Sequence, residues 1–211
     1  MEDWDSAAIW SDDERAALGV YRYYEGQETG THTRIRNLET EIHYYPDIGQ
    51  PSRSRLLVPR APGVARPLYL MNRGNYAIVH RQQNLPDLTN GRNETSIFTA
   101  FKVELTTGRI TGLGQRQYLS QISCDPQGQA SVSTGDILHV IPSPDGTQLA
   151  RLEMSPSCDG TTGTLTFLDS STLRQLDEPF QVPRIDDVFM LMNRAWSEDG
   201  RFMVAQSGFT G

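Results

Sequence analysis

The stretch VIPSPDGTQLARLEM, residues 140–154, has the composition of a β-hairpin. Pro144 and Asp145 occupy the centre of a tight turn, and Gly146 stands where a positive φ angle is needed. The runs on either side are apolar and partly β-branched, so we expect them to fold back on one another as two antiparallel strands.

The hairpin pattern recurs along the chain. RAWSEDGRFMVAQSG places Asp199 and Gly200 in the same turn positions. AIWSDDERAALGVYRYY places Asp13 there, although Glu14 replaces the glycine. LYLMNRGNYAIVHR is a weaker copy in which Gly74 matches Gly200. The four turns fall near positions 13, 73, 145 and 199, so their spacings are 60, 72 and 54 residues.

A second unit lies between these hairpins, in TEIHYYPDIGQPSRSRLL, TAFKVELTTGRITGLG and GTLTFLDSSTLRQLDEP. Each begins as an alternating apolar strand and carries an acidic residue, Asp47, Glu104 or Asp169, two or more positions before the turn. Two hairpins per repeat make four strands. Four strands at such a period are the signature of a β-propeller blade.

The repeats therefore predict an all-β fold, a single arc of an incomplete β-propeller with about three and a half four-stranded antiparallel blades. The blades are expected over residues 6–60, 66–119 and 136–184, with a half-blade over 187–211. A β-sandwich built from the same hairpins is the alternative.

An arc leaves blade faces without neighbours, and these faces are expected to be apolar. If about 400 Å² of apolar surface stayed exposed to water, the hydrophobic stabilisation lost at about 25 cal/mol per Å² would be about 10 kcal/mol. This is comparable to the stability of a whole domain. The arc is therefore expected to be completed by missing blades of the same polypeptide or, less simply, by a homodimer that closes the ring.

The turn sequences SPDGTQLARL and SEDGRFMVA resemble the Ser-Pro-Asp-Gly turns of bacterial WD-repeat-like propellers, which include TolB-like propellers and those of prolyl oligopeptidase relatives. The resemblance implies the propeller fold. It also implies, as the alternative function, an accessory propeller of a serine hydrolase or peptidase whose catalytic domain lies outside this chain.

The chain of 211 residues has a formal net charge of -7 and a pI near 5.1, which does not favour a nucleic-acid partner. No apolar run approaches the roughly 18 residues of a membrane span. The start, MEDWDSAAIWSDDE, lacks the features of a secretory signal, so either the protein is cytoplasmic or these are not its native first residues.

Cys124 and Cys158 lie in similar turn sequences, SCDPQG and SCDGTTG, which would suit a disulfide between two loops. With a sequence separation of 34 residues, such a bond would stabilise the fold by about 3 to 4 kcal/mol in the loop-entropy model. A disulfide would place the protein in a periplasmic or extracellular compartment, and two unpaired thiols are the alternative.

The sequence offers no recognisable catalytic residues and no metal or cofactor site. It has no Gly-x-Ser-x-Gly elbow, and its four histidines are not spaced as metal ligands, which favours a protein that is not an enzyme. A third interpretation places His139 and Asp136 in a central propeller channel beside a metal.

The insert QQNLPDLTNGRNETS separates the two hairpins of the second repeat. Long loops on a rigid scaffold often carry binding residues, so Leu85, Asp87, Asn90 and Arg92 are the candidate contact residues. We therefore expect a non-catalytic binding or scaffold module that holds a protein or peptide partner with its loops.

Overall fold

The computed structural model describes residues 2–3, 9–11, 14–29, 32–85, 95–119, 121–124, 131–133, 138–158, 160–185 and 196–202. The chain divides into two compact units. One comprises Met1–Asn84 with Thr99–Leu113, and the other comprises Leu85–Phe98 with Gly114–Gly211.

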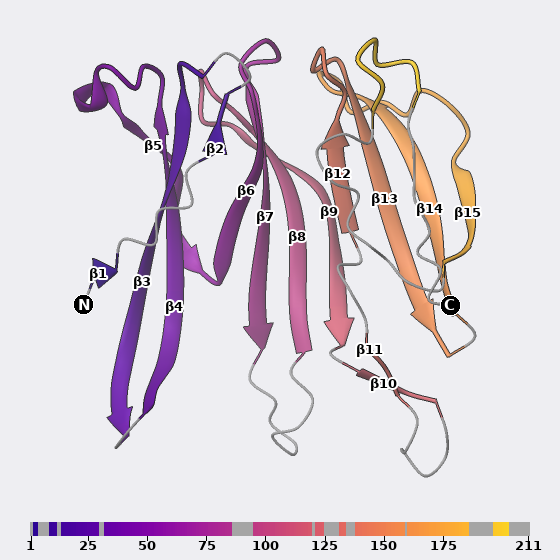
Figure 1. Cartoon of the computed structure of the whole chain (residues 1–211), viewed down its shortest axis with the longest axis horizontal. Coiled ribbons are helices and arrows are strands. Elements are labelled where there is room, and N and C mark those ends of the chain that lie inside the picture. The colour runs from indigo at the N-terminus through magenta and orange to yellow at the C-terminus, as the bar shows by residue number, and fades with distance from the viewer. Residues whose placement is uncertain are drawn as a thin grey trace. The chain divides into compact units, whose positions relative to one another are not determined.

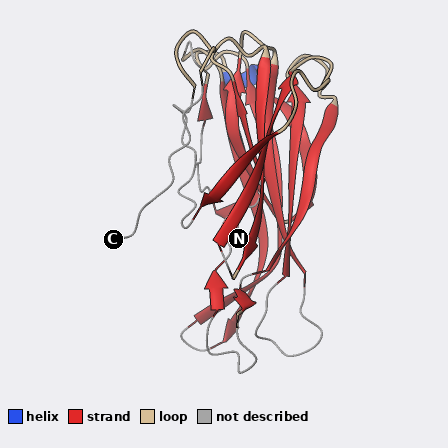
Figure 2. Ribbon diagram, turned by 90° about the vertical axis from the view of Figure 1, so that its right-hand side faces the viewer, coloured by secondary structure: helices blue, strands red, loops and turns tan. Residues whose placement is uncertain are grey.

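The predicted all-β class is confirmed: the described residues form three large antiparallel sheets, each with a core of four strands, and the first has one additional short strand (Figures 1 and 2). The first sheet contains β2 (Ile9–Trp10), β3 (Ala17–Thr29), β4 (His32–Tyr45) and β5 (Arg55–Pro62), and β1 (Glu2–Asp3) also pairs with β3. The second contains β6 (Val64–Met71), β7 (Tyr76–Leu85), β8 (Thr95–Glu104) and β9 (Ile110–Leu119). The third contains β12 (Leu138–Pro142), β13 (Gln148–Ser157), β14 (Gly160–Asp169) and β15 (Phe180–Ile185).

Two smaller elements complete the described structure. Strands β10 (Gln121–Ser123) and β11 (Ser131–Ser133) form a two-stranded sheet, and η1 (Pro51–Arg53) is a single 3₁₀ turn. No helix in the described ranges is long and apolar enough to cross a membrane. The ends of the three large sheets lie close to those of the three expected blades, and four-stranded sheets of this kind are the building units of a propeller and are also compatible with a sandwich.

The turn after the first strand of a repeat, the inner turn, has one geometry in three repeats. The N–H of Gly146 donates to the carbonyl of Ser143, and that of Gly200 donates to Ser197, both at 2.9 Å. Both glycines have positive φ angles, 73° and 69°. Glu14 adopts the same conformation with φ 56°, so the first turn forms without the glycine that its sequence lacks.

The second repeat departs from this pattern. Strand pairing places Gly74 level with Gly146, as the sequence predicts, but the positive φ falls on Asn75 at 54°. Gly74 thus lies in the turn, but the left-handed residue of this turn is Asn75. Asparagine tolerates this region, and Asn75 is held by two bonds from the next turn: the Leu105 N–H reaches its carbonyl, and the Thr106 hydroxyl reaches its Oδ1.

The turn after the third strand, the outer turn, begins at the predicted acidic residue and not two or more positions after it. Glu104 and Asp169 each accept a backbone hydrogen bond from the residue four positions later, and Asp47 accepts one from Gln50. In every sheet the residue after the acid donates its N–H to a carbonyl of the inner turn. The three bonds are Ile48 to Arg15, Leu105 to Asn75 and Ser170 to Thr147.

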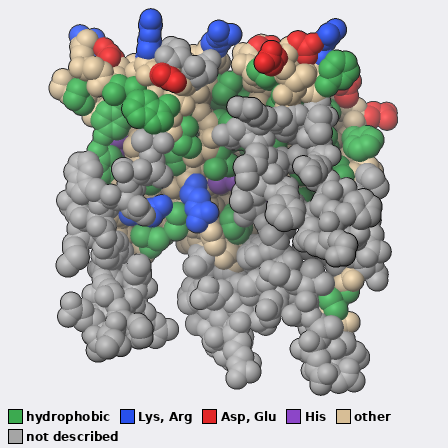
Figure 3. All heavy atoms as spheres, in the orientation of Figure 1, with side chains coloured by type: hydrophobic (Ala, Val, Ile, Leu, Met, Phe, Trp, Pro, Cys, Tyr) green, Lys and Arg blue, Asp and Glu red, His purple; other side chains and the backbone are tan. Residues whose placement is uncertain are grey.

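This shared bond between the two turns shows that the sheets are true structural repeats. Their turns concentrate charge: Figure 3 shows acidic and basic side chains at the end of the sheets where the turns of Figure 1 lie. Asp145 accepts hydrogen bonds from the Ser143 hydroxyl and the Thr147 N–H, and these bonds lower its pKa. Asp199 is bonded to Ser197 and Arg201 in the same way, and its pKa is lowered too.

In the first unit, the first sheet packs face to face on the second. Leu18, Ile42 and Val58 of the first sheet share one buried cluster with Val79 and Val103 of the second. This contact is the core of the unit, and it covers one face of each sheet.

A tight link joins these two sheets. Gly63 has φ +96°, and a Cβ there would lie 2.4 Å from the carbonyl oxygen of Gln82. The buried Thr40 hydroxyl donates to the Gly63 carbonyl and accepts from the Ala65 N–H. Only glycine fits this close approach, so the link fixes where the second sheet starts.

In the second unit, the last inner turn packs on the third sheet. The Trp196 ring meets Phe167 edge-on with the centroids 5.6 Å apart, and its Nε1–H donates to the Ile141 carbonyl at 3.4 Å. The fourth repeat therefore begins against a face of the third sheet.

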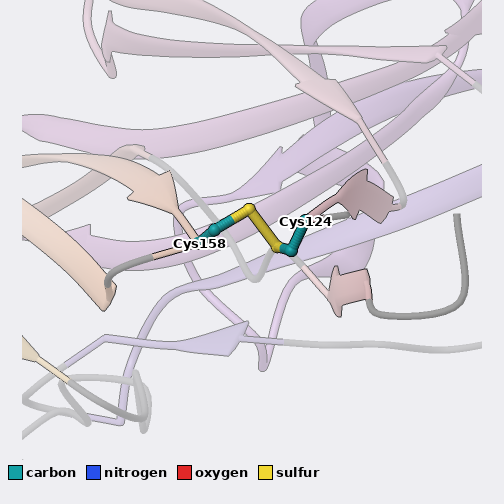
Figure 4. The surroundings of a disulfide bond; sticks show 2 residues. All are labelled: Cys124 and Cys158. Atoms are coloured by element: carbon teal, nitrogen blue, oxygen red, sulfur yellow. A yellow bond between two sulfur atoms is a disulfide. The ribbon is translucent and has the colours of Figure 1, made fainter. Parts of the chain in front are cut away.

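Cys124 and Cys158 form a disulfide, with their Cα atoms 5.3 Å apart (Figure 4). It joins the end of β10 to the turn between β13 and β14. The bond thus ties the small two-stranded sheet to the third sheet.

Candidate functional site

The candidate site is the face of the first sheet that points away from its buried cluster. Side chains alternate between the two faces of a strand, so Leu18 and Val20 enter the cluster while Tyr21 and Tyr23 point the other way. Opposite them on β4 lie Glu41 and Glu39. We call this surface the polar face; it comprises Trp10, Tyr21, Tyr23, Glu39, Glu41, His43, Tyr45, Leu56 and Arg60.

Glu41 is the centre of a hydrogen-bond network on the polar face. Its Oε1 accepts from the Tyr23 hydroxyl at 2.8 Å and lies 2.9 Å from His43 Nε2. Burial acts to raise the pKa of Glu41, but the hydrogen bonds from His43 and Tyr23 outweigh it, so the pKa is below its usual range. Glu41 is therefore ionised at neutral pH and holds both neighbours in place.

A tyrosine pair lies beside this network. The hydroxyls of Tyr21 and Tyr45 are 2.5 Å apart, and the Tyr21 ring packs against His43 with centroids 4.6 Å apart. Burial and the bond to Tyr21 raise the pKa of Tyr45 to about 12. Tyr45 also lies over Gly19, where a Cβ would meet its ring at 3.0 Å. The missing side chain at Gly19 makes room for the ring.

Arg60 extends the polar face across β5. Its guanidinium lies 4.0 Å from the centroid of the Tyr23 ring, and its Nε donates to Glu39 at 2.6 Å. This ion pair is half-exposed and contributes little to stability. Its effect is to hold the Arg60 and Tyr23 side chains in fixed positions.

The chemistry of the polar face suits contact more than catalysis. Tyrosine, tryptophan and arginine are enriched at protein interfaces because each offers a large flat surface with a polar end. Tyr45 stays protonated at neutral pH, so it presents a hydrogen-bonding hydroxyl and not a nucleophile. Within the described ranges, no group of three His, Cys, Asp or Glu side chains could hold a metal ion.

Most of the contact residues predicted in the insert fall outside the residues that the structure describes. Leu85 is the last residue of β7, and Asp87, Asn90 and Arg92 fall outside the described residues. Asp13 and Asp136 also fall outside them, while His139 is buried in β12.

The sequence does not reveal the polar face and predicts the opposite chemistry. It predicts apolar surfaces on blade faces without a neighbour, whereas this face carries three tyrosines, a histidine and charged groups. The signal was present in the alternation of VYRYY and EIHYY, but only the strand register shows that Tyr21 lies opposite Glu41 and Tyr45 opposite Ala17.

No known family model matches the chain, and no curated protein is similar to it.

Proposed function

We propose that this chain is a non-catalytic binding module of the β-propeller repeat type, which holds a protein or peptide partner on the polar face of its first sheet. The observation that carries the proposal is the hydrogen-bonded set of half-exposed aromatic side chains around Glu41. The contact surface is thus a sheet face and not only the loops that the sequence suggested.

Preorganisation supports this function. Binding costs free energy when flexible side chains must be ordered, and side chains already fixed in the free protein avoid that cost. The hydroxyls of Tyr21 and Tyr45 are hydrogen-bonded to each other, and that of Tyr23 donates to the Glu41 carboxylate on the same face. Their rings also bring contact area with few rotatable bonds.

A display experiment tests the proposal. A random peptide library is selected on the full-length wild-type chain, and a Trp10→Ser/Tyr21→Ser double variant serves as the counter-target. We expect enriched peptides to bind the wild type at least tenfold more tightly than the double variant in calorimetry. Peptides that bind both equally, or no enrichment at all, would contradict the proposal. An Ile110→Ser variant, changed at an exposed apolar residue of β9 outside the polar face, is the matched control and should bind like the wild type.

We also propose that the protein works in an oxidising compartment, because disulfides persist in the periplasm and outside cells. The Cys124–Cys158 bond supports this location. Thiol labelling of the protein in freshly lysed, acid-quenched cells should find both cysteines unreactive, and labelling of both would overturn it.

A further inference from the structure

One position of the repeat inserts a side chain into the sheet before it. Strand pairing defines this position as the residue before Ser11, Met71 and Ser197, each of which pairs across the inner turn with the residue five positions later. It is occupied by Trp10 in the first repeat, Leu70 in the second and Trp196 in the fourth. Leu70 is 4% exposed and belongs to the cluster formed with the first sheet. Trp196 packs on Phe167 of the third sheet.

Trp10 differs from these two residues because it is 54% exposed. Its neighbour Ile9 packs on the buried cluster, so the Trp10 side chain points to the opposite side, onto the polar face. Trp10 thus occupies the same repeat position as Trp196, but within the described residues its side chain is exposed, whereas that of Trp196 is partly buried.

We infer that Trp10 and the polar face dock head to tail on the C-terminal repeats of a second copy of this chain. This inference rests on the proposed function, since it uses the same face and names its partner. Trp196 shows the contact that Trp10 would reproduce: an aromatic ring for the indole edge and a main-chain carbonyl for the Nε1–H.

The exposed apolar residues favour a second copy as the partner. Among the described residues, five of the six large exposed hydrophobic side chains lie at the two ends of the repeat series. Trp10 and Leu56 are in the first sheet. Leu176 lies in the connection between β14 and β15, Phe180 in β15, and Phe202 in the last turn. Exposed apolar side chains therefore occur both on the polar face and in the C-terminal repeats, and one group could cover the other between copies.

Phe180 is the best placed of the C-terminal residues. It pairs with Leu165 across the strands β14 and β15, on the face that also carries Phe167 and receives Trp196. Phe180 remains 58% exposed on the edge strand, and Phe202 in the last turn is 65% exposed. A contact between two different surfaces of the same chain is heterologous, so each copy uses one end to bind and offers the other.

Analytical ultracentrifugation of the full chain tests the inference. We expect the mass of the wild type to rise above 23.6 kDa with concentration. Trp10→Ser alone and Phe180→Ser/Phe202→Ser alone should both stay monomeric. An equimolar mixture of the two variants should again form a dimer, because each variant supplies the end that the other lacks.

Ile110→Ser is the matched control, because it removes an exposed apolar side chain from β9 and should leave association unchanged. If circular dichroism shows that the double variant does not fold, Phe202→Ser alone replaces it, since that residue lies in an exposed turn.

Three results would overturn the inference: a wild type that is monomeric at every concentration, association that survives in both variants, or loss of association in the Trp10 variant only. The last would indicate a symmetric contact between two polar faces. A monomeric wild type that still binds selected peptides through Trp10 and Tyr21 would leave the proposed function standing.

Discussion

Two sheet faces at the same position of the repeat carry opposite chemistry. In the second sheet, the face toward the first sheet carries Ala77, Val79 and Val103, all buried. The corresponding face of the first sheet is the polar face, where Ala17 matches Ala77 and Gly19 matches Val79 by strand pairing. The backbone of the repeat is therefore compatible with either chemistry, and among the described residues the face that packs against another sheet is the apolar one.

The largest expected effect on stability comes from placing a serine on each of the two faces. Val103→Ser places a hydroxyl in the buried cluster and leaves a cavity, so we expect it to lower the free energy of unfolding by about 3 kcal/mol. Tyr45→Ser on the polar face should cost about 1 kcal/mol, because water can replace its contacts. Urea denaturation followed by circular dichroism measures both, and equal losses would break the comparison.

The tight link between the first and second sheets gives the next effect. Gly63→Ala adds a Cβ that would lie 2.4 Å from the Gln82 carbonyl, at a φ of +96°. We expect a loss of about 2 kcal/mol in the free energy of unfolding. Gly108→Ala is the control: its φ is +73° but nothing lies within 4 Å, so only the backbone cost of about 1 kcal/mol applies. Thermal unfolding of the two variants should rank them in this order.

A pH titration of stability measures what the ionised Glu41 contributes on the polar face. The pKa of Glu41 is lowered in the folded protein, so its stabilising contribution is present above its ordinary value of 4.5 and is lost as the pH falls through the folded value. We expect the stability difference between wild type and Glu41→Gln to shrink as the pH is lowered from 7 to 3. A difference that stayed constant would show that the charge of Glu41 does not hold the network.

The smallest effect concerns a single hydroxyl. Tyr21→Phe removes the bond to Tyr45 and should change the free energy of unfolding by less than about 1 kcal/mol. It should also lower the pKa of Tyr45 from about 12, though not to 10, because burial is the larger cause of the shift. Nuclear magnetic resonance of ring-labelled tyrosine measures this pKa, and an unchanged value would mean that the two hydroxyls are not coupled.

Much of the fold could be predicted from the chain because it depends on local chemistry. Asp145 and Gly146 define a turn within a few residues, and the repeat of that turn indicates four-stranded units. The conformations of Glu14 and Asn75 are harder to predict, since each residue takes a positive φ that its residue type does not demand. In the second repeat, bonds from the neighbouring outer turn fix Asn75 in that conformation.

The candidate site could not be predicted in the same way, because it is made of contacts between strands. Tyr21 and Tyr45 are 24 residues apart, and Tyr23 and Arg60 are further apart still. A shift of one residue in the pairing of β3 with β4 would have moved Tyr21 to the other face and the network would not exist.

The strands, the turns and the repeat of four strands follow from the amino-acid sequence alone, because they depend on residue preferences over short distances. Which face of each sheet is buried, where Trp10 points, and that Glu41, His43 and the tyrosines meet on one surface all depend on the packing of the folded chain. The physical reason is that burial and hydrogen bonding depend on what lies opposite a side chain, and in a sheet that neighbour is set by register and by the packing of one sheet on the next.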